Sequence, residues 1–164
     1  MTARPQIKTL RSTFIAAGVV ALFLSQRHLG FMVLFEGLIL APWIVFSIWV
    51  SIKNPQQRSY QAAKVGIWLL SVGIVIGVHF FVATQTREKA QKLVDAVMSY
   101  YASHGTYPVD TQSIGYTKEE VRSMIGMGGY YFEHGQPSFF YASTYVIYET
   151  DHYDFSKREW MHRD

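Results

Sequence analysis

Three apolar runs in the first half of the chain restrict its fold more than any other feature. They cover about residues 10–26, 30–52 and 65–84, and Glu36 is the one carboxylate among residues 12–84. The second and third runs reach the roughly 20 residues that a helix needs to cross about 30 Å of hydrocarbon. The first run is shorter, but Lys8 and Arg11 can extend their charged ends to the interface. We therefore predict a transmembrane domain of three helices over residues 1–84.

The first run could also belong to a secretory signal peptide, which has the same basic start and short apolar core. A signal peptide ends in a small-residue cleavage site of the form A-x-A, whereas LSQRHLG follows here. We therefore favour a retained helix.

Basic residues around the runs predict the orientation of the chain. Arg27, next to His28, lies between the first and second runs. Basic residues are more numerous before the first run and between the second and third: Arg4, Lys8, Arg11, Lys53, Arg58 and Lys64. Since positively charged loops stay in the cytoplasm, the amino terminus is predicted there. Three crossings of a bacterial inner membrane then leave residues 85–164 outside, in the periplasm.

Two polar residues and two glycines within the runs are candidates for helix contacts. Glu36 and His79 lie at similar predicted depths, and a carboxylate in hydrocarbon needs a partner, so we predict that they pair. We favour a structural contact between two helices as the role of this pair, with a proton or ion relay as the alternative. Gly73 and Gly77 have the small-xxx-small spacing of close helix packing. We expect them to pack within the chain, with a dimer face as the alternative.

After Thr84 the sequence QTREKAQKLVDAVMSYYASHG predicts that the third helix continues beyond the membrane. It has no Pro or Gly before Gly105, and its apolar residues recur at steps of three and four, as in an amphipathic helix. These are Ala90, Leu93, Val94, Val97, Met98 and Tyr101. Gly105 then ends the helix, and Tyr107-Pro108 forces an extended exit.

The remaining residues predict short strands. GGYYFEHG, PSFFYAST, YVIYETDHYDF and REWMHRD are aromatic and β-branched runs separated by turn residues. Thr117 and Glu120 predict a capping box that opens a short helix, and GMGG after it is predicted to be a turn. The expected class is α+β, with a small antiparallel meander packed on the amphipathic helix.

A long helix, apolar and then amphipathic, that ends in HGTYP and is followed by strands resembles a type IV pilin or a type II secretion pseudopilin. The resemblance covers about residues 65–164 and implies a pilin-like head. Prepilins have one membrane segment, preceded by a cleavage site, whereas this chain has three apolar runs and YQAAKVGIW before the third. LGFMVLFEG places Glu36 one residue too late for such a site and on the wrong side of the membrane. The resemblance therefore implies a pilin-like shape without pilin processing.

The carboxy-terminal residues contain weak candidates for a metal site. Asp151, His152, Asp154 and His162, with Asp164 after them, could supply oxygen and nitrogen ligands. Pseudopilins of the major type bind calcium in this region, but the spacing here matches no assignable pattern. A solvated hairpin anchored by Trp160 is the favoured alternative, and we predict no metal and no cofactor. Cysteine, a serine elbow and HExxH are absent, so an enzyme is not expected.

Aromatic residues are more numerous in the tail than so small a head can bury, which predicts a contact surface. The candidates, about half of which should be core, are Tyr130, Tyr131, Phe139, Tyr141, Tyr145, Tyr148 and Tyr153. We expect a non-enzymatic accessory component of an envelope or secretion-type assembly, in contact with membrane lipid and another envelope protein. The alternative is a membrane-bound immunity protein that meets a toxin. The net charge of +3 sums two unlike halves and predicts no nucleic acid partner, and no small-molecule substrate is identified.

Overall fold

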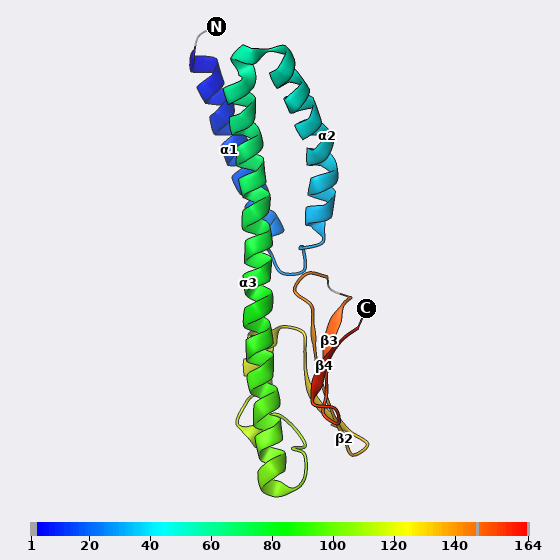
Figure 1. The fold of residues 1–164 in the computed structure, drawn as a ribbon. Coiled ribbons are helices and arrows are strands. Elements are labelled where there is room, and N and C mark those ends of the chain that lie inside the picture. The colour runs from blue at the N-terminus through cyan, green and yellow to red at the C-terminus, as the bar shows by residue number, and fades with distance from the viewer. Residues whose placement is uncertain (1–2, 147, 164) are drawn as a thin grey trace. The chain divides into compact units, whose positions relative to one another are not determined.

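The computed structural model describes residues 3–146 and 148–163, with side chains from Thr9 onward (Figure 1). The chain divides into two compact units, Met1–Phe80 and Phe81–Asp164. This division lies close to the predicted boundary between residues 84 and 85.

The first unit is helical. It contains α1 (Ala3–Leu24), α2 (Met32–Lys53), the short 3-10 helix η1 (Pro55–Gln57) and the first part of α3 (Arg58–His104). Helix α1 ends two residues before the predicted limit, and a turn containing His28 in a left-handed conformation, with φ of 69°, separates it from α2. By length and composition, α2 and α3 can each cross a membrane, while the apolar part of α1, Thr9–Leu24, is shorter.

Helices α1 and α3 make close contact along one stripe of α3. The Ser71 hydroxyl donates a hydrogen bond to the Ala17 carbonyl at 2.9 Å, and Val75, one turn later, is fully buried against Ala21 and Leu24. One further turn along, His79 reaches the end of α1. The spacing of four residues places Ser71, Val75 and His79 on one face of α3.

Gly73 and Gly77 lie outside this stripe, which differs from the predicted packing. A Cβ placed on either glycine would meet no described atom within 4 Å. The small residues that allow close approach are on α1, at Ala17 and Ala21, because the stripe at 71, 75 and 79 turns the glycines away from α1.

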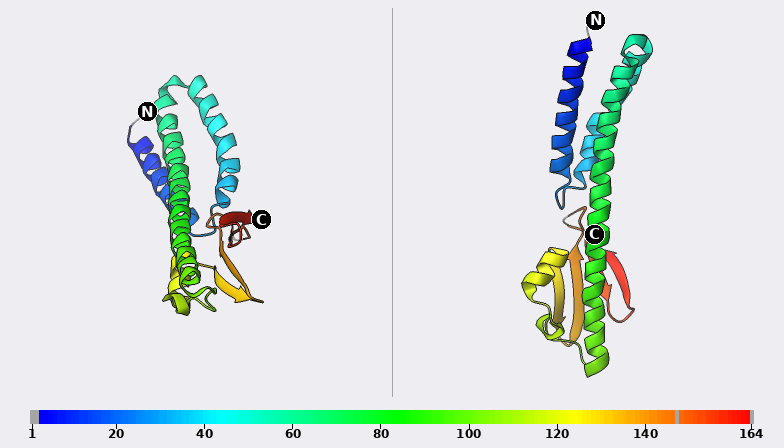
Figure 2. Two further views of the ribbon diagram at one scale, coloured as in Figure 1. Left: turned by 60° about the horizontal axis from the view of Figure 1, so that its bottom comes forward. Right: turned by 90° about the vertical axis from the view of Figure 1, so that its left-hand side faces the viewer.

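The second unit contains the later part of α3, a single turn η2 (Gln112–Ile114), α4 (Lys118–Ile125) and a four-stranded antiparallel sheet. The strands are β1 (Gly128–Glu133), β2 (Gln136–Ala142), β3 (Thr150–Asp154) and β4 (Glu159–Arg163), and each pairs with the next in sequence. Figure 2 shows the sheet beside the later part of α3 in its right-hand view. The predicted α+β class with a small antiparallel sheet is confirmed.

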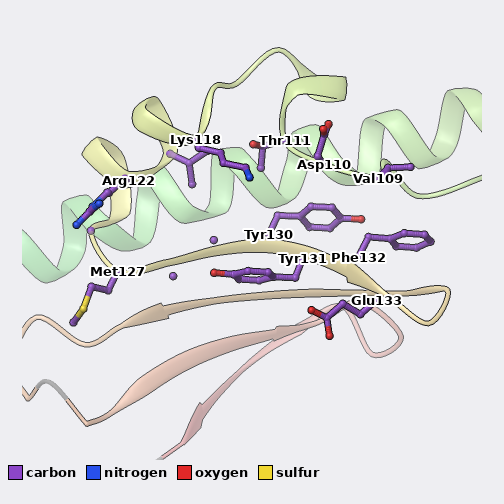
Figure 3. Close-up of a pocket in the computed structure, with 14 residues that line it drawn as sticks. Val109, Asp110, Thr111, Lys118, Arg122, Met127, Tyr130, Tyr131, Phe132 and Glu133 are labelled. Atoms are coloured by element: carbon purple, nitrogen blue, oxygen red, sulfur yellow. The ribbon is translucent and has the colours of Figure 1, made fainter.

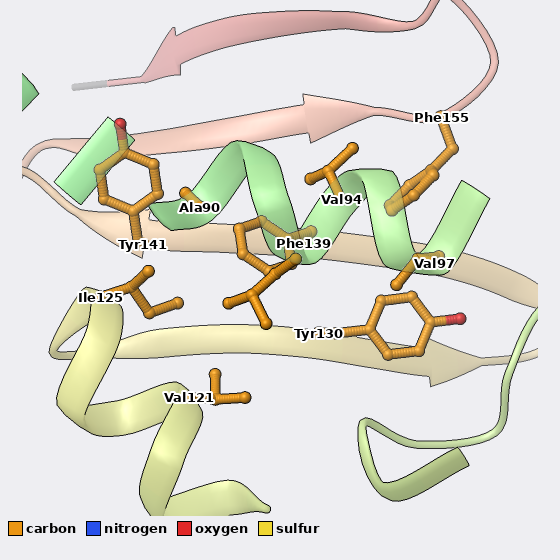
Figure 4. Packing of buried hydrophobic residues seen from close by; sticks show 10 residues of the cluster. Ala90, Val94, Val97, Val121, Ile125, Tyr130, Phe139, Tyr141 and Phe155 are labelled. Atoms are coloured by element: carbon orange, nitrogen blue, oxygen red, sulfur yellow. The ribbon is translucent and has the colours of Figure 1, made fainter. Parts of the chain in front are cut away.

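The core of this unit lies between α3 and the sheet (Figure 4). Ala90, Leu93, Val94 and Val97 of the predicted stripe are each at most 1% exposed, and they form one cluster with side chains of β1, β2 and α4. Met98 is partly buried against the same cluster, while Tyr101 is exposed and stacks on Tyr107. Burial of this stripe explains why the helix remains ordered beyond its apolar half.

Local signals set the ends of the helices. Gly105 has a φ of 71° directly after α3, where a left-handed residue closes a helix. The capping box is present at the start of α4: the Thr117 hydroxyl accepts from the Glu120 amide at 3.2 Å, and the Glu120 carboxylate accepts from the Thr117 amide at 2.8 Å. The Glu120 carboxylate accepts hydrogen bonds from both the amide and the hydroxyl of Thr117, and these bonds favour its charged form and lower its pKa.

Candidate functional site

The aromatic residues of the sheet divide by strand alternation between the core and the surface. Phe139 is fully buried against α3, and Tyr130 and Tyr141 are 7% and 4% exposed. Tyr130 donates its phenolic hydrogen to the Pro108 carbonyl at 2.7 Å. Burial raises the pKa of Tyr141 to about 12. These three predicted surface candidates are therefore core residues.

The other four predicted candidates have exposed area. Tyr131, Tyr145 and Tyr148 are 44%, 36% and 85% exposed, while Tyr153 is half-buried between Phe155 and Trp160. Only Tyr131 of these lies on the sheet face opposite α3, because it follows inward-facing Tyr130 in β1. The surface candidates are thus spread over more than one part of the unit.

A row of side chains crosses this opposite face of the sheet. Phe140 follows the buried Phe139, so it points away from α3. His152 is its register partner on β3, and Met161 is the register partner of His152 on β4. The ring of Phe140 stacks between Tyr131 and His152, with centroids 5.5 Å and 5.3 Å away. We call Tyr131, Phe140, His152 and Met161 the outer row.

The electrostatics of the outer row favour a neutral His152. Its Nε2 is hydrogen-bonded to the Thr150 hydroxyl at 3.0 Å. Burial, followed by the positive charge of Arg163, lowers the pKa of the His152 imidazole. The row is therefore a continuous, mainly apolar strip, with Glu133 exposed on the same face of β1.

A groove of about 560 Å³ lies between α4 and β1 (Figure 3). Lys118 and Arg122 of α4 line one wall and β1 lines the other, with Asp110 and Glu133 also on its surface. Asp110 accepts hydrogen bonds from the amide and hydroxyl of Ser113, which lower its pKa. The groove thus carries both charge signs and an exposed Met127.

The weak metal candidates at the carboxy-terminal end are separated by the hairpin. Asp151 and His162 are register partners, with Oδ1 and Nδ1 3.2 Å apart. His152 lies on the opposite face, and Asp154 caps the turn by accepting from the Ser156 and Lys157 amides. Among the described residues, no three His, Asp or Glu side chains group as ligands. Asp164 lies outside the described residues.

Trp160 joins the sheet to α3. It packs partly buried against the core, and its Nε1 donates to the Gln91 Oε1 at 2.7 Å. The Arg87 guanidinium lies 4.0 Å from the centre of the Trp160 ring and 4.0 Å from the Asp151 carboxylate. Asp151 therefore takes part in ion pairs rather than facing an open ligand site.

Glu36 and His79 do not form the predicted pair. His79 donates from Nε2 to the backbone carbonyl of Leu24 at 2.8 Å. Glu36 is 9% exposed, and neither of its carboxylate oxygens has a hydrogen-bond partner among the described residues. The reason is that Leu24 ends α1, so its carbonyl has no partner within the helix and competes for the imidazole.

Three residues of the outer row, Phe140, His152 and Met161, were not among the surface candidates predicted from sequence, and His152 was considered as a weak metal candidate alone. The signal that could have found Phe140 is the two-residue turn His134-Gly135, which sets the register of β1 and β2. With Tyr130 opposite Phe139, both face the core, so Tyr131 and Phe140 must face outward.

Comparisons with known proteins add no relative: no family model, no curated protein and no solved structure matches this chain.

Proposed function

We propose that this chain is a non-enzymatic inner-membrane protein that crosses the membrane three times and presents a pilin-like head to a protein partner in the periplasm. Two helices of sufficient length and apolarity support insertion. Large apolar side chains also cover the outside of the helical unit: Phe14, Leu22, Leu34, Leu38, Phe46 and Phe80 are each more than half exposed. Such a surface is suited to contact with lipid, because exposure of so many apolar side chains to water is unfavourable in free energy.

The pilin-like character of the head is supported by one long helix whose later part lies under a four-stranded antiparallel meander. The helix continues without a break from Arg58 to His104. A role as an accessory component of an envelope or secretion-type assembly would use this head as a docking element.

The outer row is the observation that carries the proposed binding function. Its side chains lie on the sheet face that α3 does not cover, and stacked aromatic rings supply large contact area with little loss of conformational freedom. Protein interfaces are enriched in Tyr, Phe and Met at their centres, and three of the four residues of this row are of these types.

The test is photo-crosslinking in living cells with a benzophenone amino acid in place of Tyr131. The matched control places the same amino acid at Gln112, which is exposed on η2 and outside the row. We expect Tyr131 to give a defined adduct with an envelope protein, and the second substitution Phe140→Ala to remove it.

Two results would contradict this proposal. Equal adducts from positions 131 and 112 would show non-specific contact. An adduct that forms solely when a competitor delivers a toxin, and that contains the toxin, would replace the assembly function with immunity.

A further inference from the structure

A second groove, of about 480 Å³, lies among the three helices of the first unit. Its main wall is α2, with Phe35, Glu36, Ile39 and Trp43, while Leu24 of α1 and Trp68 of α3 contribute to the others. Phe35 and Ile39 are 55% and 72% exposed, so the groove opens onto the apolar outside of the unit. We call it the Glu36 groove.

The Glu36 carboxylate is the feature of this groove that needs an explanation. It is nine-tenths buried, lines an otherwise apolar wall and has no hydrogen-bond partner among the described residues. A polar group left unpaired in such surroundings is costly. The group that satisfies it must therefore donate hydrogen bonds, and a cationic donor would compensate its charge best.

The position and size of the groove indicate what kind of molecule carries that donor. Glu36 lies four residues after the first residue of α2, Met32, which places it about 6 Å along the axis from that end. Trp43 lies seven residues deeper, about 10 Å further. A volume of 480 Å³ suits one small molecule or acyl chain and is too small for a partner's helix.

We propose that the Glu36 groove binds a membrane lipid with a primary ammonium head group, which donates to the Glu36 carboxylate while an acyl chain lies against Trp43 and Trp68. A head group near the end of α2 and a chain directed toward its middle match the direction of a lipid in one leaflet. This inference rests on the membrane insertion proposed above, but it does not depend on the function of the head.

The experiment uses the full chain, purified in detergent and incubated with vesicles that contain equal amounts of phosphatidylethanolamine and phosphatidylcholine with identical acyl chains. Native mass spectrometry then counts the lipids that each protein retains. The trimethylated choline head has no N–H donor, so the pair isolates the hydrogen bond to Glu36. We expect the wild type to retain the ethanolamine lipid about tenfold over the choline lipid, the ratio for loss of one charge-assisted hydrogen bond.

Three variants separate the parts of the proposal. Glu36→Gln should retain both lipids about equally. Ile39→Trp fills the groove and should lower retention of both, whereas Leu38→Trp is the matched control, since Leu38 is 71% exposed and does not line the groove. Leu38→Trp should behave as wild type.

Equal retention of the two lipids by the wild type, a preference that survives Glu36→Gln, or retention of no lipid would overturn the proposal. A peptide or protein that occupies the groove in the mass spectrum would also overturn it. Carbonate extraction of the cell membranes distinguishes failure of the lipid site from failure of the proposed membrane insertion. If the protein stays in the membrane fraction and retains no ethanolamine lipid, the lipid site alone is wrong.

Discussion

At the scale of single residues, Phe139 and Phe140 show how one step along a strand changes the role of a side chain. Phe139 is fully buried and meets the Trp160 ring at 5.8 Å edge to face, whereas Phe140 is partly exposed in the outer row. The first therefore contributes to stability through packing, and the second is available to a partner.

We expect Phe139→Ala to lower the free energy of unfolding by about 3–5 kcal/mol, because it leaves a cavity between α3 and the sheet. Phe140→Ala should cost about 1 kcal/mol, since a partly exposed ring loses less burial. Thermal denaturation of the full chain in detergent, followed by the aromatic circular dichroism of the head, measures both. Equal losses for the two variants would contradict the assigned faces of the sheet.

The stability of the head should depend on pH through His152. Its folded pKa is lowered below the ordinary value of about 6.5, so the unfolded chain binds the proton more readily. The stabilisation from the neutral, stacked ring is complete above pH 6.5 and is lost as pH falls through the folded pKa. We therefore expect the melting temperature to drop between pH 7 and pH 5, and to drop less in His152→Gln. If the melting temperature of the variant fell with pH as steeply as that of the wild type, groups other than His152 would cause the pH dependence.

At the scale of elements, contact between α1 and α3 depends on polar groups that reach backbone carbonyls. Ser71 contacts Ala17 in the middle of α1, and His79 contacts Leu24, its last residue. Since the last carbonyls of a helix have no partner within it, His79 acts as a cap supplied by another helix. The hydrogen bond requires the proton on Nε2, which fixes the tautomer of the ring.

His79→Phe should therefore destabilise the helical unit by about 1–2 kcal/mol, because the Leu24 carbonyl loses its donor while the volume is kept. Gly77→Ala is the control on the same helix, because an added methyl would meet nothing within 4 Å, and it should cause no loss. The measurement is resistance of the full chain to heat in detergent. If Gly77→Ala lowered the heat stability as much as His79→Phe, the result would support the small-residue packing predicted from sequence.

Much of the fold could be predicted from the sequence because its signals are local. The stripe from Ala90 to Val97, the glycine after His104 and the capping box at Thr117 each depend on residues within one or two turns. These signals predict helices, their ends and the face that is buried.

Contacts between elements could be predicted less well, because they depend on how each helix is rotated and on which way each strand faces. The pair of Glu36 and His79 was predicted from side chains alone, whereas the partner of His79 is a backbone carbonyl that no residue type reveals. In the same way, Tyr130 and Phe139 are as aromatic as Tyr131 and Phe140, and the register of the hairpin decides which pair is buried.

At the scale of the whole molecule, the proposed orientation can be tested directly because the chain has no cysteine. Single cysteines at Gln56, in η1, and at Lys157, in the exposed turn between β3 and β4, would report on the two sides of the membrane on which the proposed topology places them. In spheroplasts we expect a membrane-impermeant maleimide to label Lys157→Cys at once and Gln56→Cys only after lysis. The opposite pattern would invert the topology, and labelling of both at once would show that the segment between them does not cross the membrane.

The order of the strands has a consequence for how the head is made. Because the spatial order β1-β2-β3-β4 is also the order of synthesis, each strand pairs with the one that left the ribosome just before it. The helix that supports the sheet precedes all four. Pairing of successive strands therefore closes short loops, such as the two residues between β1 and β2. A small sequence separation between contacting residues favours rapid folding. The sheet of the head can therefore form one strand at a time, because no strand pairs with a segment that is distant in sequence.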